Sequence, residues 1–469
     1  MSSLGAEPDK KIEAVILAAG RGTRMASKLP KVLHHLAGQE LLRHVLTTVA
    51  HLEPESTHVV VGFEAAQVRE ALDDMNGQIT WVTQEQQLGT AHAVQQATQG
   101  IGKGATVLVL LGDVPLITEE TLSTCVEQAA DNSICVVTAE VANPDGLGRI
   151  IRNAEGAIEK IVEQQDTTDD ERRITEINSG IMAIPSEILV DLLSQVSSDN
   201  AKKEYYLTDI VGIAKASGIE VTGMKAADAD EVSGINTRQQ LSALERSHQR
   251  KLARKLMAGG TAIADPERLD IRGEVTAGVD CFIDVNVIFE GEVVLGDGVS
   301  IASGCVISKS RLGNGVRVEP HTVVDGASVA KGCTLGPFAR IRPGTVLDEN
   351  VKIGNFVETK KATLGRGTKA NHLAYLGDAN LGEDCNVGAG TVTCNYDGAE
   401  KHTTKIGNEV FVGTNATLVA PLDIEDNAFV AAGSTITKTV EAGDLGVGRG
   451  RQKNIKGWRP PSARGTDKG

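Results

Sequence analysis

The sequence has no long apolar segment of the kind that crosses a membrane. A bilayer span needs roughly 18–20 apolar residues, and the longest candidate, 106–117, is interrupted by Asp113 and Pro115. The first 11 residues are polar and lack the apolar core of a secretory signal. We therefore expect no association with a membrane.

The sequence also lacks closely paired cysteines and an excess of basic residues. Its seven cysteines are scattered from Cys125 to Cys394 without a Cys-x-x-Cys pair, which argues against a disulfide framework and a structural zinc site. This favours a reduced, cytoplasmic protein. A net charge of −15 argues against nucleic acid as a partner, because a phosphate backbone needs a basic face. Small phosphorylated substrates would require local clusters of basic residues.

The length of 469 residues predicts two or three domains. Between residues 12 and 235, short β-branched runs alternate with amphipathic stretches. This order predicts an α/β domain with a Rossmann-like, mostly parallel sheet, which binds ligands at the carboxyl ends of its strands. The expected strands are 12–18, 58–62, 79–83, 106–111 and 134–141, and two of the expected helices are 65–72 and 91–99.

A different pattern follows this first region. Residues 238–257 have a leucine stripe and end before Gly259–Gly260, which predicts a connecting helix. From Thr261 an aliphatic residue recurs at every sixth position, a period that fits neither a helix nor a simple strand. It is typical of a hexapeptide parallel β-helix with about 18 residues in each coil, whereas a chance β-rich array would not sustain it. Two series carry the pattern: Leu335, Ile341, Leu347, Ile353, and Ile406, Val412, Leu418, Ile424, Val430, Ile436.

A lapse in this period at 393–405 predicts a loop inserted into one coil. Inserted loops in repeat proteins often lie at a binding site.

A glycine-rich turn follows the first expected strand. Gly20 and Gly22 let backbone N–H groups approach phosphate oxygens, and Arg24 and Lys31 add two cations nearby. The spacing matches neither a P-loop nor a dinucleotide fingerprint.

The segment from Leu17 to Met25, followed by Pro30–Lys31, resembles the Leu-x-x-Gly-x-Gly-Thr-x-Met…Pro-Lys signature of the sugar-phosphate nucleotidyltransferases. The resemblance extends to a uracil-recognising segment, to an aspartate after an apolar strand, and to four positions that hold an N-acetylglucosamine moiety. It implies that the substrates of uridylyl transfer contact Leu17, Ala18, Ala19, Gly20, Arg24, Lys31, Gln84, Gly89, Thr90, Gly112, Asp113, Gly148, Glu163, Asn178 and Asn236.

The resemblance implies one Mg²⁺, held by Asp113 and Asn236. A carboxylate and an amide oxygen, completed by phosphates and waters, suit this ion. Uridylyl transfer needs no protein nucleophile, because positioning and charge neutralisation carry the reaction. Read singly, Asp113, Asn178 and Asn236 are also ordinary turn residues, and Lys31 is also an ordinary solvated lysine.

A second group of residues with functional side chains lies within the hexapeptide array, at positions where the repeat does not require them. Arg342, Lys360 and Tyr375 lie 15–18 residues apart, near the length of one coil, so they can stack on one wall and face a small anion. His372 lies among them. A histidine titrates near neutral pH and can take the proton from an ammonium substrate, although a lone histidine is more often structural.

Residues 12–460 resemble the bifunctional N-acetylglucosamine-1-phosphate uridyltransferase/glucosamine-1-phosphate acetyltransferase family. Segments that match are 336–340, 354–358, 372–375 and 393–398. The resemblance implies acetyl transfer from acetyl-CoA to glucosamine-1-phosphate, then uridylyl transfer from UTP, which supplies cell-wall precursors. It implies that His372 is the proton acceptor. The contacts implied for the sugar phosphate are Arg342, Lys360, Tyr375 and Asn386. Those implied for the coenzyme or its surroundings are Ala389, Asn395, Tyr396, Thr414, Ala432 and Arg449.

The same resemblance implies a left-handed β-helix and a homotrimer with acetylation sites between subunits. The domains would be a uridylyltransferase domain at 1–237, a linker helix at 238–260 and an acetyltransferase domain at 261–469. Thr414 departs from the family, where serine is frequent, but retains a hydroxyl. A basic tail with Arg449 suits a phosphate of the coenzyme or is simply solvated, and residues after Pro460 read as disordered.

Two other functions compete with this hypothesis. A monofunctional sugar-phosphate nucleotidyltransferase with a regulatory β-helix has no use for His372 among cations. A non-catalytic assembly protein has no use for Asp113 beside a glycine-rich phosphate loop. Both residues therefore favour an enzyme with two sites.

Overall fold

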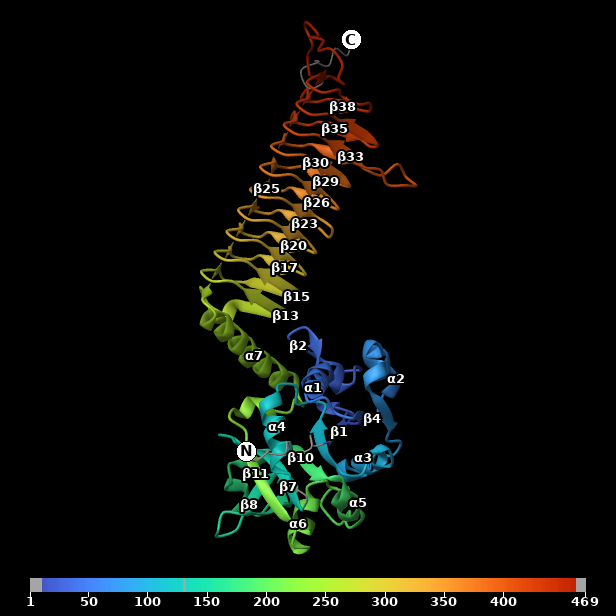
Figure 1. Ribbon diagram of the computed structural model, residues 1–469, viewed down its shortest axis with the longest axis vertical. Coiled ribbons are helices and arrows are strands. Elements are labelled where there is room, and N and C mark those ends of the chain that lie inside the picture. Colours follow the sequence, from blue (N-terminus) through green and yellow to red (C-terminus); the bar gives the residue numbers. More distant parts are fainter. Residues whose placement is uncertain (1–10, 130–131, 461–469) are drawn as a thin grey trace, which may run out of the picture. The chain divides into compact units, whose positions relative to one another are not determined.

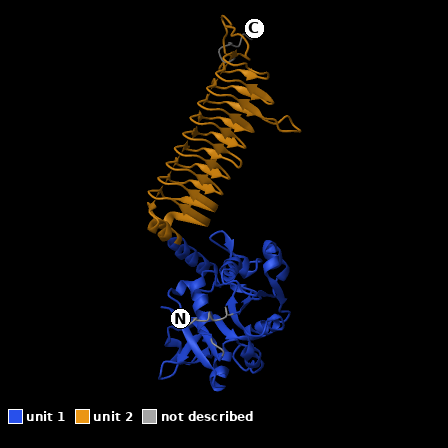
Figure 2. Cartoon of the chain, in the orientation of Figure 1, with its two compact units in different colours: residues 1–251 blue, residues 252–469 orange. Residues whose placement is uncertain are grey.

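The structure is a computed structural model that describes residues 11–129 and 132–460. Its contacts divide the chain into two compact units, with the boundary between Lys251 and Leu252 (Figure 2). The boundary lies within helix α7 (Arg238–Ala258). The expectations for the first ten residues and for the tail after Pro460 fall outside the described residues.

Unit 1 is built on one sheet with the strand order β11-β7-β10-β6-β1-β4-β5, and β8 and β9 extend it beside β10 (Figure 1). β1 pairs in parallel with β4 and β6, whereas β10 is antiparallel to β6 and β7. The antiparallel strand is a feature that the sequence pattern did not reveal. The strands are β1 (Lys11–Leu17), β4 (Ser56–Val61), β5 (Thr80–Thr83), β6 (Ala105–Leu111), β7 (Ser133–Glu140), β8 (Arg149–Arg152), β9 (Ile158–Val162), β10 (Glu176–Pro185) and β11 (Glu220–Lys225), beside a small hairpin of β2 (His35–Leu36) and β3 (Gln39–Glu40).

Helices cover both faces of this sheet. Successive side chains of a strand point to opposite faces, so Ile16 of β1 joins one core with Val45 and Leu122, while Val15 joins the other with Val94. The first core packs under α1, α2 and α4, and the second packs under α3, α5 and α6. The helices are α1 (Leu41–Ala50), α2 (Ala65–Ala71), α3 (Thr90–Ala97), α4 (Glu119–Gln128), α5 (Ser186–Ser194) and α6 (Asp209–Ala216).

Helix α7 ends where the glycine pair predicts. Gly260 has a φ of 97°, a left-handed conformation that glycine adopts without strain. The Thr261 N–H donates to the Leu256 carbonyl over 3.1 Å, which closes the last turn. Among the described residues, no helix combines the length and the apolar character needed to cross a membrane.

Unit 2 is a parallel β-helix, as the six-residue period indicates, and it is left-handed, as the family resemblance implies. The aliphatic residues of both predicted series are buried in one continuous core. One face stacks β12 (Ala262–Ile263), β14 (Phe282–Ile283), β16 (Ser300–Ile301), β19 (Arg317–Val318), β22 (Thr334–Leu335), β25 (Lys352–Asn355), β28 (Lys369–His372), β31 (Asn386–Val387), β34 (Phe411–Val412), β37 (Phe429–Val430) and β39 (Leu445–Gly446).

The other two faces of the β-helix join into one wider sheet, because β13 and β15 run around a corner without a break. Their strands are β13 (Leu269–Ala277), β15 (Val287–Leu295), β17 (Val306–Ser308), β18 (Arg311–Leu312), β20 (Val323–Asp325), β21 (Ser328–Val329), β23 (Arg340–Ile341), β24 (Val346–Leu347), β26 (Glu358–Lys360), β27 (Thr363–Leu364), β29 (Tyr375–Gly377), β30 (Ala379–Leu381), β32 (Val392–Cys394), β33 (Thr404–Ile406), β35 (Thr417–Val419), β36 (Leu422–Ile424) and β38 (Thr435–Ile436).

The predicted insertion is present in this array. Lys352 pairs with Lys369 and Lys369 with Asn386, each 17 residues on, but Asn386 pairs with Phe411, 25 residues on. The additional residues form the loop between β32 and β33 that projects from the β-helix in Figure 1.

Candidate functional sites

The glycine-rich turn leaves β1 at its carboxyl end, where an α/β sheet binds ligands. A side chain at Gly20 would meet nothing within 4 Å, so the backbone there faces open space. Gly22 has a φ of 61°, and a Cβ on it would lie 2.6 Å from the Lys31 Cβ. The sequence therefore needs glycine at position 22 to bring Lys31 against the turn.

The ammonium of Lys31 lies between the two predicted metal ligands. It forms an ion pair with Asp113 and donates to the Asn236 amide oxygen over 3.1 Å. Asp113 follows β6, and its carbonyl accepts from the Ile235 N–H over 3.0 Å. That backbone bond fixes Asn236 beside Asp113, although the two residues are far apart in the sequence.

This donor set fits Mg²⁺. A carboxylate oxygen of Asp113 and the amide oxygen of Asn236 both accept from the Lys31 ammonium, so these two oxygens lie close enough to share one cation. Mg²⁺ keeps waters and accepts phosphate ligands, so two protein oxygens suffice.

A cavity of about 370 Å³ opens beside this group. Glu204, Gln87 and Val32 also line it and were not predicted; the Gln87 amide donates to the Ala19 carbonyl over 2.9 Å. The cavity brings together nine of the predicted contacts: Leu17, Ala18, Ala19, Gly20, Lys31, Gln84, Gly89, Thr90 and Asp113.

Gly89 is required by a close approach of the chain to itself. Its φ is 122°, and a Cβ there would lie 2.4 Å from the Tyr205 carbonyl oxygen. The Gln84 amide, buried, donates to the Gly89 carbonyl over 3.1 Å, and the Leu207 N–H donates to the Thr90 hydroxyl over 2.9 Å. These bonds give the wall of the cavity its shape.

Three predicted sugar contacts form a second group on neighbouring strands. The Asn178 N–H donates to the Gly148 carbonyl over 2.9 Å, and a Cβ on Gly148 would lie 3.7 Å from the Glu163 Oε1. Burial raises the pKa of Glu163, although the Thr208 hydroxyl donates to this carboxylate over 3.2 Å.

Besides Asn236 and the three sugar contacts above, two more predicted contacts do not line the 370 Å³ cavity. Arg24 is exposed in a short 3₁₀ turn at Thr23–Met25. Gly112 does not line it, but its N–H donates to the Leu17 carbonyl over 2.9 Å.

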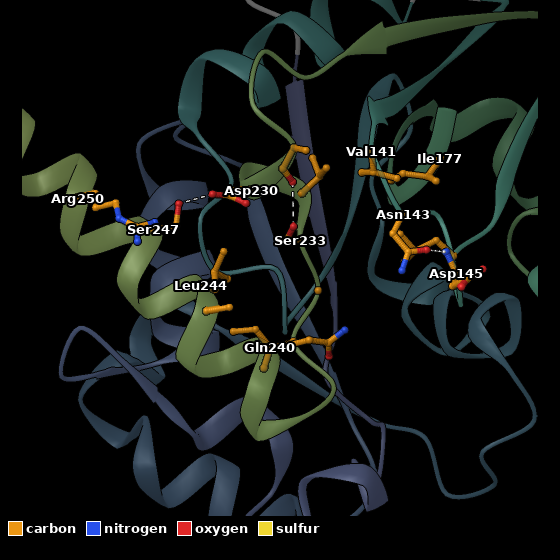
Figure 3. Close-up of a pocket in the computed structure, with 16 residues that line it drawn as sticks. Val141, Asn143, Asp145, Ile177, Asp230, Ser233, Gln240, Leu244, Ser247 and Arg250 are labelled. Atoms are coloured by element: carbon orange, nitrogen blue, oxygen red, sulfur yellow. Dashed lines mark hydrogen bonds between the residues drawn. The ribbon is translucent and has the colours of Figure 1, made fainter. Parts of the chain in front are cut away.

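A second cavity, of about 510 Å³, lies between α7 and the loop after β7 (Figure 3). Asn143 and Asp145 line one side, and Ser247, hydrogen-bonded to Asp230, lines the other. Sequence reasoning did not find this cavity. Its wall includes the residues that directly precede three predicted sugar contacts: Leu147, Ile177 and Ile235.

In the β-helix, His372 is held by the preceding coil. Its Nδ1 lies 2.9 Å from the Asn355 Oδ1, and the two residues pair in register between β25 and β28. With the amide oxygen as acceptor, Nδ1 carries the proton and Nε2 is the basic nitrogen. His372 is exposed, so a substrate can reach it.

The predicted cationic wall is present with an unexpected register. Arg342 lies over Lys360, and Lys360 pairs with Gly377 rather than with Tyr375. A Cβ on Gly377 would lie 2.4 Å from the Tyr375 hydroxyl, so the phenol lies across this glycine. Arg342 also forms an ion pair with Glu358 over 2.7 Å.

Lys401 is a further cation that the sequence reasoning missed. It comes from the inserted loop, and it is the main cause that lowers the pKa of Lys360, with Arg342 adding to the effect. Mutual repulsion of ammonium groups favours an anion between them. In the sequence, the length of the insertion was the one sign that its residues could lie beside Arg342 and Lys360.

The predicted coenzyme contacts lie in a column that continues from His372. The β28–β31 register places Ala389 one coil after His372. The N–H of Asn415 donates to the Ala389 carbonyl over 2.7 Å, and that of Gly433 donates to the Thr414 carbonyl over 2.8 Å. Arg449 donates to the Ala432 carbonyl over 2.6 Å, and Asn386 begins β31 beside this column.

The inserted loop has internal order. Asn395 is buried and donates to Asp378, whereas Tyr396 is exposed and its hydroxyl donates to the Gly398 carbonyl over 2.6 Å. Three donors hold the pKa of the Asp397 carboxyl well below its usual range: the backbone N–H of Glu400, which contributes most, the His402 side chain and the backbone N–H of Ala399. The His402 Nε2 lies 2.7 Å from the Asp397 carboxylate.

Known proteins resemble both units. Residues 14–177 match the MobA-like NTP transferase domain, 271–364 the GMPPB C-terminal domain, and 403–438 the hexapeptide repeat of succinyl-transferase. "Bifunctional protein GlmU" from Marinobacter nauticus is 49% identical over 96% of this chain and 99% of its own. The protein of the same name from Pseudomonas entomophila is 50% identical over 96% and 98%. The chain belongs to the GlmU family.

Membership of the GlmU family confirms the predicted family and the enzyme with two activities, rather than the monofunctional alternative. A nucleotidyl transferase from Methanothermobacter thermautotroptrophicus aligns with 51% of this chain and 99% of its own at 20% identity, with a TM-score of 0.39. The individual site residues stay predictions.

Proposed function

We propose that this GlmU-family chain acetylates glucosamine-1-phosphate with acetyl-CoA and then couples N-acetylglucosamine-1-phosphate to UTP, releasing pyrophosphate. The observation that carries this proposal is the pair of separate sites, one in each unit. Lys31, Asp113 and Asn236 converge beside a cavity in unit 1. His372 faces solvent near a cationic wall in unit 2.

For acetyl transfer, His372 Nε2 takes the proton from the ammonium of glucosamine-1-phosphate. The freed amine attacks the thioester carbonyl of acetyl-CoA, an amide bond forms, and the carbon–sulfur bond breaks to release CoA. Asn355 keeps the imidazole in the required tautomer. Arg342, Lys360 and Lys401 offer the sugar phosphate charge-assisted hydrogen bonds.

For the coenzyme, the small residues Ala389, Thr414 and Ala432 leave room along one column of the β-helix. Arg449, at the end of that column, suits a phosphate of CoA.

For uridylyl transfer, a phosphate oxygen of the sugar attacks the α-phosphorus of UTP and pyrophosphate leaves. Gly20 offers its backbone to the phosphates, Lys31 offers a cation, and Gln84, which lines the cavity, suits recognition of the uracil base. We propose that Asp113 and Asn236 hold Mg²⁺, which when bound neutralises phosphate charge. Gly148, Glu163 and Asn178 bind the sugar.

We further propose a homotrimer assembled through the β-helix. Phe338, Phe356 and Leu373 occupy one corner on successive coils with φ of 51–57°, a conformation that is strained for bulky side chains. Each is at least half exposed. The coil before Phe338 places His321 at this corner, and coils further away place glycine or asparagine there, as at Gly304 and Asn415. A partner subunit would bury this apolar ladder.

The substrates, UTP and acetyl-CoA, are intracellular metabolites, which supports a cytoplasmic location for the enzyme and a role in supplying cell-wall precursors. The proposal is tested by giving purified protein glucosamine-1-phosphate, acetyl-CoA, UTP and Mg²⁺. Both CoA and pyrophosphate should form, and omission of acetyl-CoA should stop both. With N-acetylglucosamine-1-phosphate, pyrophosphate should form without acetyl-CoA. Release of only one product under all conditions would refute the proposal.

A further inference from the structure

Arg149 is a charged residue buried in unit 1, and the proposed reactions leave it without a role. It begins β8, and none of its surface is exposed. Its guanidinium donates to the Leu147 carbonyl, to the Gln164 Oε1 over 2.7 Å, and to the Arg172 carbonyl over 3.5 Å. Within the described part of the chain these acceptors are uncharged oxygens, and its Nε has no partner.

Such burial is unfavourable for a cation. A buried arginine normally meets a carboxylate, and here burial lowers the pKa of the guanidinium, while the charge of Asp145 raises it. An apolar side chain could fill the same space without this cost. What distinguishes arginine from an apolar residue at this position is therefore the fixed directions in which its guanidinium holds its acceptors.

The acceptors of Arg149 come from segments that flank the proposed sugar contacts. Leu147 directly precedes Gly148, and Gln164 directly follows Glu163. Arg149 itself pairs with Ile177 of β10, next to Asn178. The guanidinium thus contacts the neighbours of Gly148 and Glu163, and the backbone of Arg149 pairs with the neighbour of Asn178.

Gln164 extends this network. Its Oε1 also accepts from the Gly146 N–H over 3.1 Å, so a single amide oxygen joins Arg149 to the loop after β7. That loop carries Asn143 and Asp145 into the 510 Å³ cavity (Figure 3). The planar fork of arginine can hold several carbonyl oxygens in fixed directions, which a lysine ammonium does not do.

We propose that Arg149 is a positioning residue for the acceptor sugar phosphate, holding the backbone around Gly148 and Glu163 at the spacing that the sugar requires. This inference rests on the proposed uridylyl transfer. It predicts that Arg149 affects binding of the acceptor sugar phosphate and not binding of UTP. The residues that its guanidinium contacts do not line the 370 Å³ cavity.

The test compares Arg149→Met, Arg149→Lys and Gln164→Leu in the full-length chain. We expect Arg149→Met to raise the KM for N-acetylglucosamine-1-phosphate about tenfold. A change of this size corresponds to the free energy of one charge-assisted hydrogen bond. The KM for UTP should change less than about twofold. Arg149→Lys should recover part of the loss, and Gln164→Leu should show a smaller rise of the same kind.

Arg152→Met is the matched control, because Arg152 lies on the same strand but pairs with Glu176 over 2.7 Å and is partly exposed. It should leave both KM values unchanged. UTP binding by calorimetry reports the folding of unit 1, and acetyl transfer reports unit 2. A loss of UTP binding in Arg149→Met, or an equal change in both KM values, would make Arg149 merely structural and overturn the inference.

Unchanged kinetics in all three variants, with an active wild-type enzyme, would overturn this inference alone. A wild-type enzyme that forms no pyrophosphate from UTP and the sugar phosphate would remove the proposed function, and this inference with it.

Discussion

The imidazole Nδ1 of His372 lies 2.9 Å from the amide oxygen of Asn355, on the preceding coil of the β-helix. This contact ties the tautomer of the proposed base to a residue 17 positions earlier in the chain. Asn355→Ala should lower kcat/KM for acetyl transfer about tenfold, because the neutral imidazole loses its orientation. Pyrophosphate release, measured on the same preparation, should not change.

Asn355→Asp tests the same contact by charge. A carboxylate beside the imidazole stabilises the protonated form. The free base then appears only at higher pH, and the acidic limb of the pH profile for acetyl-transfer kcat/KM should move upward. A profile identical to that of the wild type would contradict the assignment of His372 as base.

The Lys31–Asp113–Asn236 group predicts a metal-dependent reaction in unit 1 alone. A chelator of divalent cations should abolish pyrophosphate release, and added Mg²⁺ should restore it. CoA release should continue throughout. Lys31→Met should reduce uridylyl transfer about 10²–10³-fold, as expected for the loss of a cation that stabilises phosphate charge. Equal sensitivity of both activities to the chelator would contradict this separation.

Asp209, the first residue of α6, predicts a pH-dependent stability. Burial, with Glu163 and Asp166 nearby, raises the pKa of this carboxyl to about 6. Ionisation of Asp209 is therefore unfavourable in the folded state. As the pH rises, its free-energy cost begins near the ordinary pKa of about 4 and reaches its full size above about pH 6.

Asp209→Asn should therefore stabilise unit 1 at pH 7.5 by about 1 kcal/mol, a value reduced for the partial exposure of the group. This corresponds to about 2–4 °C in Tm, and the gain should disappear near pH 4. The exposed Asp191 provides the control variant, Asp191→Asn, for which we expect no such dependence. A gain that persists at pH 4 would contradict the electrostatic origin.

The apolar corner of the β-helix predicts a solution assembly. Replacing both Phe338 and Phe356 with aspartate should convert the trimer to smaller species in light scattering, because charge on this surface opposes burial. The control is Val190→Asp in unit 1, at a side chain that is 55% exposed. A wild-type monomer would contradict the proposed trimer.

The β-helix was predictable because its information is local. Each coil repeats the same burial requirement, so Ile341 and Val412 reveal the period without knowledge of the fold. The antiparallel β10 was not predictable in this way, since a buried apolar strand reads alike in either direction. The pairing of Asn355 with His372 depends on coil register, which the aliphatic period alone does not single out.

Site residues were predicted where a motif fixes the backbone and missed where the fold brings loops together. Gly22 and Lys31 belong to one sequence motif, so their proximity follows from the motif. Lys401 comes from an insertion with no period, and the role of Arg149 depends on three separate segments. Arg24 is exposed in its turn, and its contact with the phosphates stays a prediction.

The central claim is that one chain carries two independent sites, and His372→Ala and Asp113→Ala test it most directly. His372→Ala should lower CoA release about 10²–10⁴-fold and retain pyrophosphate release from N-acetylglucosamine-1-phosphate, and Asp113→Ala should do the reverse. Mixed together with glucosamine-1-phosphate, acetyl-CoA and UTP, the two variants should again form the nucleotide sugar. Loss of both activities in each folded variant would contradict the account.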